Sequence, residues 1–249
     1  MAILVTRPEP DNTTTVAALR AAGRDVLSAP MLRFEPVALQ DDPDSHYGAV
    51  IVTSANALRA IAGQAALPAL LDLPLFAVGD NTANAAHNAG FKKVFSADGD
   101  AAALRDLIAS KKSTSKRLKS GDPLLYLAGA DLARDLAGEL GARGFTVVTQ
   151  TTYRMAPIDT LPPEIADAFS AGKVSAVLHY SRRSARAFIE ATRAGGVEIT
   201  ALALPQCCLS DAVAAIVRDA GATQVMVART PNETALFELL DRAIGPGSR

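Results

Sequence analysis

Short aliphatic runs alternate along this chain with longer amphipathic stretches rich in alanine. In the first copy of the pattern, residues 3–5 are apolar, Thr6-Arg7-Pro8 forms a polar turn, and an amphipathic stretch over 12–22 ends at Gly23. Apolar runs between turn residues predict buried parallel strands, and stretches that follow Ser, Thr, Asp or Asn predict capped helices. Further strands are predicted at 49–52, 75–78, 124–127, 176–179, 201–204 and 225–228, and further helices at 55–62, 82–89, 131–142, 184–194, 211–220 and 233–244.

Because strand and helix alternate throughout, the sequence predicts an α/β fold with two doubly wound, flavodoxin-like parallel-sheet domains. Two extended segments interrupt the alternation, since neither has a helix directly behind it. We interpret them, at about 32–38 and 147–156, as paired hinge strands of a two-stranded linker. Domain one then comprises 1–35 and 155–249 and is discontinuous, while domain two comprises 38–152. A single long sheet is the alternative.

Composition and charge exclude several classes of protein. The net charge is −1, and only 5% of the residues are aromatic, with no Trp, so neither a nucleic-acid partner nor an anionic membrane surface is expected. The first apolar run covers only residues 2–5 and predicts neither a signal peptide nor a membrane span. The only cysteines, Cys207 and Cys208, are adjacent, which suits a reducing compartment better than a disulfide or a zinc site. We therefore expect a monomeric protein of the cytoplasm.

Motifs for nucleotide, metal or hydrolase chemistry are missing from the sequence. There is no G-x-G-x-x-G, no P-loop and no G-x-S-x-G elbow, and His46, His87 and His179 lack the spacing of metal ligands. The polar segment 109–122, basic over 111–119, fits either an anion-binding loop or a solvated insertion, and its interrupting Ser and Gly residues favour the insertion. Catalysis therefore does not come from a recognisable dyad, triad or metal centre.

Small polar turns follow most of the predicted strands. In open α/β sheets such turns gather at the carboxyl edge beside helix N-termini, where backbone N–H groups attract anions. The same Ser, Thr and Asn residues are also common N-caps, so each has a structural alternative. Tyr153, in the second hinge strand, could donate a proton or simply pack for its β propensity. The candidate ligands of an anionic substrate are Arg7, Thr53, Ser54, Asn56, Thr82, Ser181, Ser184 and Ser210.

An ordered series of short segments resembles the uroporphyrinogen-III synthase family over nearly the whole chain. The segments are I-L-V-T-R-P (3–8), V-T-S-A-N-A (52–57), A-V-G-D-N-T-A (77–83), Tyr153, Y-S-R-R-S (180–184) and C-L-S (208–210). The resemblance implies two α/β domains with the active site between them, and a lyase that needs no cofactor or metal. It also implies a polyanionic linear tetrapyrrole, hydroxymethylbilane, as substrate. The enzyme would close it into uroporphyrinogen III with its last pyrrole ring inverted, a step of haem biosynthesis.

The resemblance also suggests roles for single residues. Tyr153 matches the linker tyrosine of the family and is the candidate catalytic residue, while Thr82, Ser181 and Ser184 match turn positions of the family. The sequence departs from the family at Asn56, where some members carry a basic residue, and at 210–212, where others have a threonine. Two alternatives remain: a two-domain anion-binding or sensor protein of the cytoplasm without catalysis, and a flavodoxin-like nucleotide or flavin protein.

Overall fold

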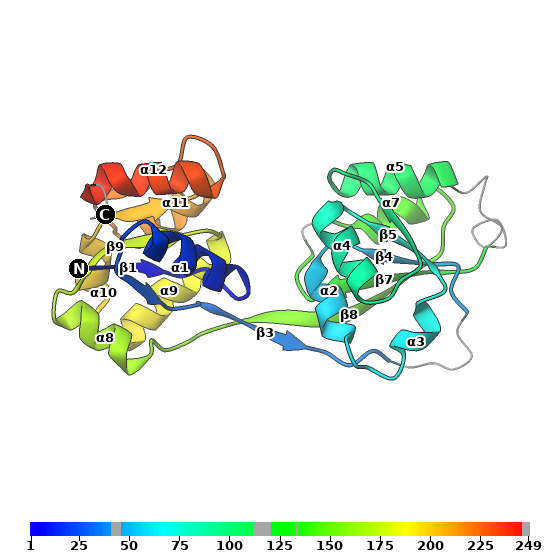
Figure 1. Cartoon of the computed structure of the whole chain (residues 1–249), viewed down its shortest axis with the longest axis horizontal. Helices are drawn as coiled ribbons and strands as arrows, with labels where there is room; N and C mark the ends of the chain where they lie inside the picture. The colour runs from blue at the N-terminus through cyan, green and yellow to red at the C-terminus, as the bar shows by residue number, and fades with distance from the viewer. Residues whose placement is uncertain (41–45, 112–120, 133, 246–249) are drawn as a thin grey trace. The chain divides into compact units, whose positions relative to one another are not determined.

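The computed structural model describes residues 1–40, 46–111, 121–132 and 134–245, so most of the basic segment 111–119 lies outside the described residues. The chain divides into two compact units. Unit 1 comprises Met1–Phe34 and Ala156–Arg249, and unit 2 comprises Glu35–Met155. Strand and helix alternate within each unit around a mainly parallel sheet, which confirms the predicted α/β class (Figure 1).

Unit 1 is built on a five-stranded parallel sheet in the order β11-β10-β9-β1-β2. Side chains of β1 and β9 on one face, among them Ile3, Val5 and Leu178, pack against α1 and α12. Helices α9 and α11 contact each other, and their buried residues lie outside that cluster. The elements are β1 (Ala2–Val5), α1 (Asp11–Ala21), β2 (Val26–Ser28), α8 (Pro163–Ser170), β9 (Val174–His179), α9 (Arg182–Ala194), α10 (Glu198–Ala203), β10 (Gln206–Cys208), α11 (Asp211–Asp219), β11 (Val225–Val227) and α12 (Glu233–Ile244).

Unit 2 contains a six-stranded sheet in the order β3-β8-β7-β4-β5-β6. Helices α2, α3 and α4 cover one face, where Leu58 and Leu70 join the core, and α5 and α7 cover the other through Leu104 and Leu140. The elements are β3 (Leu32–Pro36), β4 (Ala49–Val52), α2 (Ala55–Ile61), α3 (Leu67–Leu70), β5 (Pro74–Ala77), α4 (Asp80–Asn88), β6 (Lys93–Ser96), α5 (Ala101–Lys111), β7 (Leu124–Gly129), α7 (Leu136–Gly141) and β8 (Val147–Pro157).

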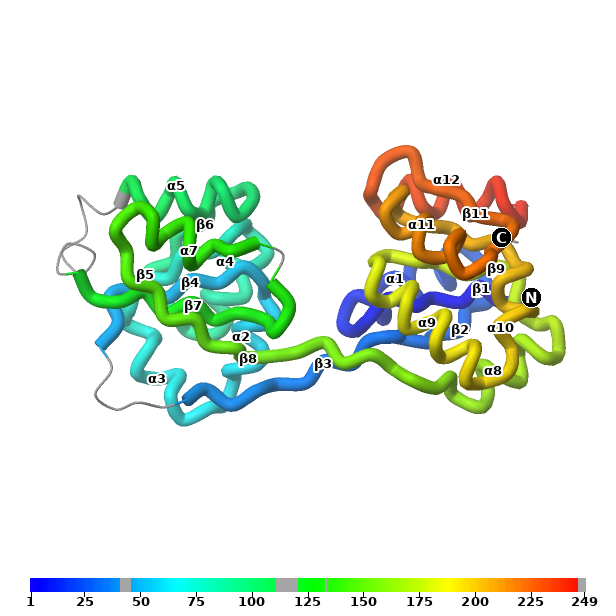
Figure 2. The backbone as a smooth tube through the Cα atoms, turned by 180° about the vertical axis from the view of Figure 1, so that it is seen from behind, coloured from blue at the N-terminus to red at the C-terminus, as the bar shows by residue number. Residues whose placement is uncertain are grey.

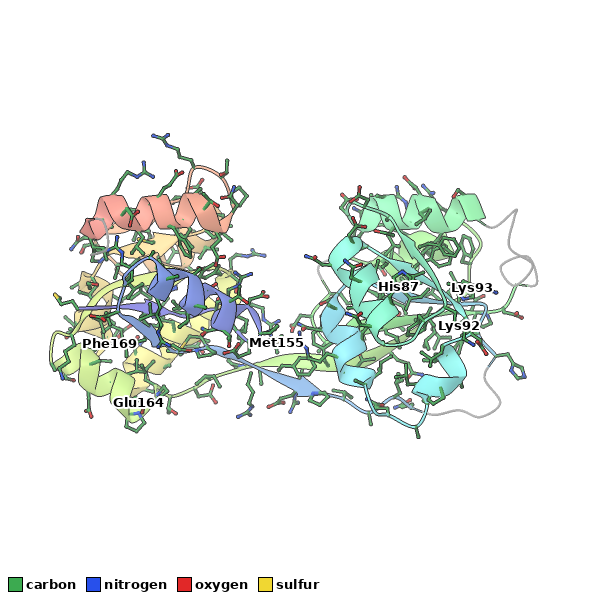
Figure 3. The ribbon with its side chains drawn as sticks, in the orientation of Figure 1. His87, Lys92, Lys93, Met155, Glu164 and Phe169 are labelled. Carbon is green, nitrogen blue, oxygen red and sulfur yellow. The ribbon has the colours of Figure 1, made fainter. Side chains whose placement is uncertain are left out.

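Strands β3 and β8 connect the two units, and both connections can be traced in the backbone tube of Figure 2. The Ile158 N–H donates to the Met31 carbonyl (3.0 Å), and the Val37 N–H donates to the Thr152 carbonyl (2.6 Å). The two strands therefore run antiparallel, whereas the pairs among β8, β7, β4, β5 and β6 are parallel. Met155, labelled in Figure 3, is the last residue of unit 2.

Each sheet has one point at which the order of the strands reverses. In unit 1 the chain passes from β1 to β2 on one side and later to β9, β10 and β11 on the other, which is the flavodoxin-type order. In unit 2 it passes from β4 to β5 and β6 and then to β7 and β8 on the opposite side. The switch points, β1/β9 and β4/β7, are where open α/β sheets bind ligands at their carboxyl edges.

Two predicted elements are wrong in detail. Residues 201–203, predicted as part of a strand, belong to helix α10. The strand of this part of the chain is β10, and it begins later, at Gln206–Cys208. A short apolar run has too few residues to show whether its period is that of a helix or a strand. The helix predicted over 131–142 begins only at Leu136, with the Asp135 side chain accepting from the Gly138 N–H (2.9 Å) as its cap.

Candidate active site

Tyr153 lies in β8 at the level where its neighbour β7 ends. The register pairs Ala128 with Thr151 and then Gly129 with Tyr153, so Thr152 is one extra residue in β8. Thr152 is fully buried, and its hydroxyl donates to the Ala128 carbonyl (3.1 Å). The Tyr153 ring lies against Gly129, where a Cβ would come within 2.7 Å of the tyrosine Cζ atom and 2.9 Å of its hydroxyl oxygen. Tyr153 therefore stands at the carboxyl edge of unit 2, beside the β4/β7 switch point.

Thr53 and Tyr126 form a hydroxyl pair at this switch point. Thr53 directly follows β4, and its Oγ1 lies 3.0 Å from the Oη of Tyr126, which projects from β7 and is 3% exposed. Burial raises the pKa of Tyr126, the bond to Thr53 opposes that rise, and a charge on Tyr153 would raise the pKa further. Sequence reasoning missed Tyr126, since it occurs inside an apolar run that predicts a strand.

The other predicted ligands of unit 2 stand at the starts of two helices. Ser54 is the N-cap of α2 and accepts from the backbone N–H of Asn56 (3.2 Å), which is itself in the first turn. Helix α4 begins after Gly79, an N-cap without a side chain, and Thr82 in its first turn is 6% exposed. A Cβ on Gly79 would meet nothing within 4 Å, so the backbone at this helix start is open to approach.

Arg7 stands at the carboxyl end of β1 in unit 1 and is engaged by neighbouring side chains. Its guanidinium donates to Glu233 Oε1 (3.2 Å), to Asp11 Oδ2 (2.8 Å) and to Thr15 Oγ1 (3.4 Å). It also lies over the ring of Tyr180, 4.8 Å from the centroid, and the Tyr180 hydroxyl donates to Glu233 (3.2 Å). Burial and the Glu233 charge raise the pKa of Tyr180. The positive charge of Arg7 is therefore already balanced by the carboxylates of Glu233 and Asp11.

Three predicted serines stand at the starts of helices α9 and α11. Ser181 is the N-cap of α9 and accepts from the Ser184 N–H (3.1 Å), and the two hydroxyl oxygens are 2.7 Å apart. Ser184 is fully buried, so its hydroxyl serves this cap. Ser210 is the N-cap residue of α11, but its side chain makes no capping hydrogen bond. Ser181 thus stands beside the β1/β9 switch point, and Ser210 one strand further along the edge.

The predicted residues therefore gather in two groups, one at the carboxyl edge of each sheet. The edge of unit 2 carries Thr53, Ser54, Asn56, Thr82 and Tyr153. The edge of unit 1 carries Arg7, Ser181, Ser184 and Ser210. Among the residues that the structure describes, no three His, Cys, Asp or Glu side chains are grouped as metal ligands would be. Within the same residues, no helix is both long and apolar enough to cross a membrane.

The model of one protein family, described as HEM4, uroporphyrinogen-III synthase HemD, matches residues 13–238 of this chain. The chain belongs to the uroporphyrinogen-III synthase family. Its function is accordingly in tetrapyrrole biosynthesis, as a cyclising lyase of this family. Among curated protein sequences, none matches this chain.

Solved structures of uroporphyrinogen-III synthases share the fold of this chain. The synthetase from Helicobacter pylori superposes with a TM-score of 0.64 at 17% identity, and the match covers 96% of this chain and 97% of that one. A mutant synthase from Thermus thermophilus gives a TM-score of 0.55 at 17% identity, with 98% of each chain covered. The two-unit α/β arrangement is thus the fold of the family.

Proposed function

We propose that this chain cyclises hydroxymethylbilane to uroporphyrinogen III, with Tyr153 as the acid that assists the departure of the terminal hydroxyl. The observation that carries the proposal is the family match over residues 13–238. The position of Tyr153 supports its role, because a phenol at a carboxyl edge stands where open α/β sheets bind their ligands. The alternative of an anion-binding protein without catalysis is not favoured by the family match.

The substrate's own chemistry sets what the protein has to do. The terminal hydroxyl takes a proton from the Tyr153 phenol and leaves as water while the adjacent pyrrole nitrogen supplies the electron pair. The resulting azafulvene is attacked by the substituted carbon of the last ring, and the spiro intermediate fragments and closes again with that ring inverted. The proton released when the pyrrole regains its aromaticity returns to the phenolate. One water is lost overall, and no electrons are exchanged.

We propose that the carboxyl edges bind the acetate and propionate groups of the substrate. Each edge presents helix N-termini, where backbone N–H groups and the helix dipole favour anions. Thr53, Ser54, Asn56 and Thr82 serve this purpose in unit 2. Arg7, Ser181 and Ser210 serve it in unit 1, where the buried Ser184 contributes through its bond to Ser181. Because the substrate is reactive without the enzyme, the main contribution of these contacts is to hold one folded conformation of the chain of pyrroles.

We further propose that the enzyme acts as a monomer in the cytoplasm. Among the described residues the exposed large apolar side chains are Met1, Leu132 and Ile199, too few for the apolar core of a stable dimer interface. Cys207 and Cys208 are free thiols, which suits a reducing compartment. Light scattering after gel filtration should give about the chain mass of 25.9 kDa, and a value near twice that would refute the monomer.

The activity is tested by separating product isomers. Purified protein is given freshly generated hydroxymethylbilane, the products are oxidised, and the type I and type III porphyrins are separated. Without an active enzyme, the substrate closes spontaneously to the type I isomer. A reaction with heat-denatured protein is therefore the control. We expect type III to predominate with native protein. Only type I from folded protein would refute the proposed function.

A further inference from the structure

The direction of the Tyr153 side chain depends on an irregularity of β8. In a regular parallel pair, Gly129 would face Thr152, because Ala128 faces Thr151. The extra residue shifts the register, so that Tyr153 faces Gly129 instead. Bulges of this kind re-aim a side chain at the end of a ladder. Two hydrogen bonds hold this one, from the Thr152 hydroxyl to the Ala128 carbonyl (3.1 Å) and from the Ala130 N–H to the Tyr153 carbonyl (2.9 Å).

Gly129 is the surface on which the tyrosine ring rests. A Cβ at this position would lie 2.7 Å from Cζ, 2.9 Å from the hydroxyl oxygen and 3.1 Å from Cε2 of Tyr153. Carbon atoms in favourable contact are about 3.5–4.0 Å apart, so the ring fits only because the side chain is missing. All three atoms belong to the outer end of the phenol, which is the end that carries the proposed acid.

The backbone does not explain why residue 129 is a glycine. Gly129 is not among the residues with a positive φ, and it lies within strand β7, where alanine adopts the same conformation. Other glycines of the chain, such as Gly90 and Gly144, do occupy positive-φ positions. What requires a glycine at position 129 is therefore the space that it leaves for the Tyr153 ring.

We propose that Gly129 is a positioning residue, which sets the place of the Tyr153 hydroxyl by leaving room for the ring. This inference rests on the proposed role of Tyr153 as the acid. An added methyl group would push the ring by about 1 Å, because the clash is with the outer end of a rotatable side chain and not with backbone. A displacement of that size is enough to lower turnover by up to about 100-fold without loss of the fold.

Gly129→Ala tests the proposal, with Gly141→Ala as the matched control. Gly141 closes helix α7, and its Cβ would meet nothing within 4 Å. We expect Gly129→Ala to lower kcat by about 10- to 100-fold with KM within about twofold of the wild type, since the phenol moves and the substrate contacts stay. Gly141→Ala should keep the wild-type kcat. In protein labelled with ¹³C at tyrosine Cζ, only Gly129→Ala should shift the Tyr153 resonance.

The same substitution in a Tyr153→Phe background shows whether Gly129 acts through the tyrosine. We expect Gly129→Ala to change kcat by less than about twofold there, because the acid is already gone. An equal fall in both backgrounds would overturn the proposal, and so would an unchanged kcat in the single variant. If the wild type forms only type I product, the proposed function fails and the inference fails with it. Wild-type type III formation with an inert Gly129→Ala refutes the inference alone.

A second variant decides the case in which Gly129→Ala does not fold. Thr152→Val keeps the shape of the side chain and removes the hydroxyl that bonds to the Ala128 carbonyl. It loosens the bulge without adding an atom near the ring. We expect kcat to fall several-fold in the wild-type background and to change by less than about twofold beside Tyr153→Phe. An unchanged kcat in Thr152→Val would then overturn the proposal.

Discussion

The hydroxyl groups at the starts of this protein's helices differ in their burial and in the hydrogen bonds that they already make. Ser184 is buried and bonded to Ser181, so its contribution to binding would act through the shape of the cap. Ser210 occupies an N-cap position without making the cap bond, and its hydroxyl can turn toward a ligand at no cost to the helix. Thr53 shares its hydroxyl with Tyr126. These residues look alike in the sequence, and only their partners distinguish them.

At Tyr153, removing the hydroxyl should separate catalysis from folding. Tyr153→Phe keeps the ring against Gly129 and deletes the hydroxyl that we propose as the proton donor. Since general acid catalysis is worth about 10²–10⁴-fold, we expect kcat to fall by at least about 100-fold. The free energy of unfolding in urea should change by less than about 1 kcal/mol. Unchanged turnover in a well-folded variant would refute the acid role and leave the family assignment intact.

His179 is a buried base whose environment keeps it neutral. Its Nε2 lies 2.8 Å from Oε1 of Gln206, and the amide nitrogen of Gln206 donates to two backbone carbonyls, so the Nε2–H of His179 is the donor. Nδ1 has no hydrogen-bond partner in the structure. Full burial lowers the pKa of His179 to about 4, although the bond to Gln206 opposes the fall.

That lowered pKa predicts a loss of stability in mild acid. An unfolded histidine takes up its proton near pH 6.5 and the folded one only near pH 4, so the unfolded state binds more protons in between. The stability is complete above about pH 6.5 and is lost as the pH falls to about 4, by about 3 kcal/mol in total. Urea unfolding at several pH values measures this slope.

Substitution should remove the part of the slope that belongs to His179. His179→Gln is expected to lower stability at pH 7 and to flatten the dependence between pH 4 and 6.5. His87→Gln is the matched control, since it makes the same substitution at an exposed histidine of α4 (Figure 3). A slope that survives His179→Gln unchanged would show that other groups cause it.

At the scale of elements, the pattern of apolar residues predicted the positions of most strands. It could not predict which side chains meet across a sheet. Strands β1, β4, β5 and β9 follow from their buried aliphatic runs. The strand predicted at 201–204 was wrong, because the strand β10 is only three residues long and begins with a buried Gln206. The pairing of Tyr126 with Thr53 could not be predicted, since residues 73 positions apart meet only through the strand order.

The group around Arg7 joins four elements of unit 1. Glu233 at the start of α12 accepts hydrogen bonds from Arg7 after β1, from Thr15 in α1 and from Tyr180 after β9. The Arg7 and Glu233 side chains are 27% and 33% exposed, so the ion pair is worth about 1 kcal/mol or less. Its structural role is to hold α1 and α12 against the same end of the sheet.

Two alanine variants separate this structural role from substrate binding. Arg7→Ala and Glu233→Ala should each lower the free energy of unfolding by about 1 kcal/mol, and the double variant by clearly less than the sum. If Arg7 also binds substrate, KM rises in Arg7→Ala and stays near the wild-type value in Glu233→Ala. Equal KM values in the two variants would remove Arg7 from the substrate contacts. Fully additive losses of stability would mean that the pair does not interact.

For the molecule as a whole, the reactivity of two buried thiols measures whether unit 1 is folded. Cys207 and Cys208 lie in β10 of unit 1, both fully buried, and burial raises the pKa of each thiol to about 12. We expect no reaction with a disulfide reagent such as DTNB in native buffer and two thiols per chain in concentrated urea. Rapid labelling of the native chain would contradict this burial.

The same thiols test whether the units unfold separately. Leu4→Ala in β1 and Leu75→Ala in β5 remove the same buried side chain from unit 1 and unit 2, and each should cost about 2–5 kcal/mol. Leu4→Ala should lower the urea concentration at which the thiols react, while Leu75→Ala should leave it nearly unchanged. Equal shifts would show that both units unfold in one step.

The interrupted course of unit 1 has a consequence for synthesis on the ribosome. Strand β1 precedes all of unit 2 in the chain, yet it lies between β2 and β9, and β9 begins only at Val174. All of unit 2 emerges in the meantime and can fold as a continuous piece, as domains do during translation. Strand β1 therefore lacks its neighbour β9 until unit 2 has been made, and until then Ile3, Leu4 and Val5 are side chains that a chaperone would meet.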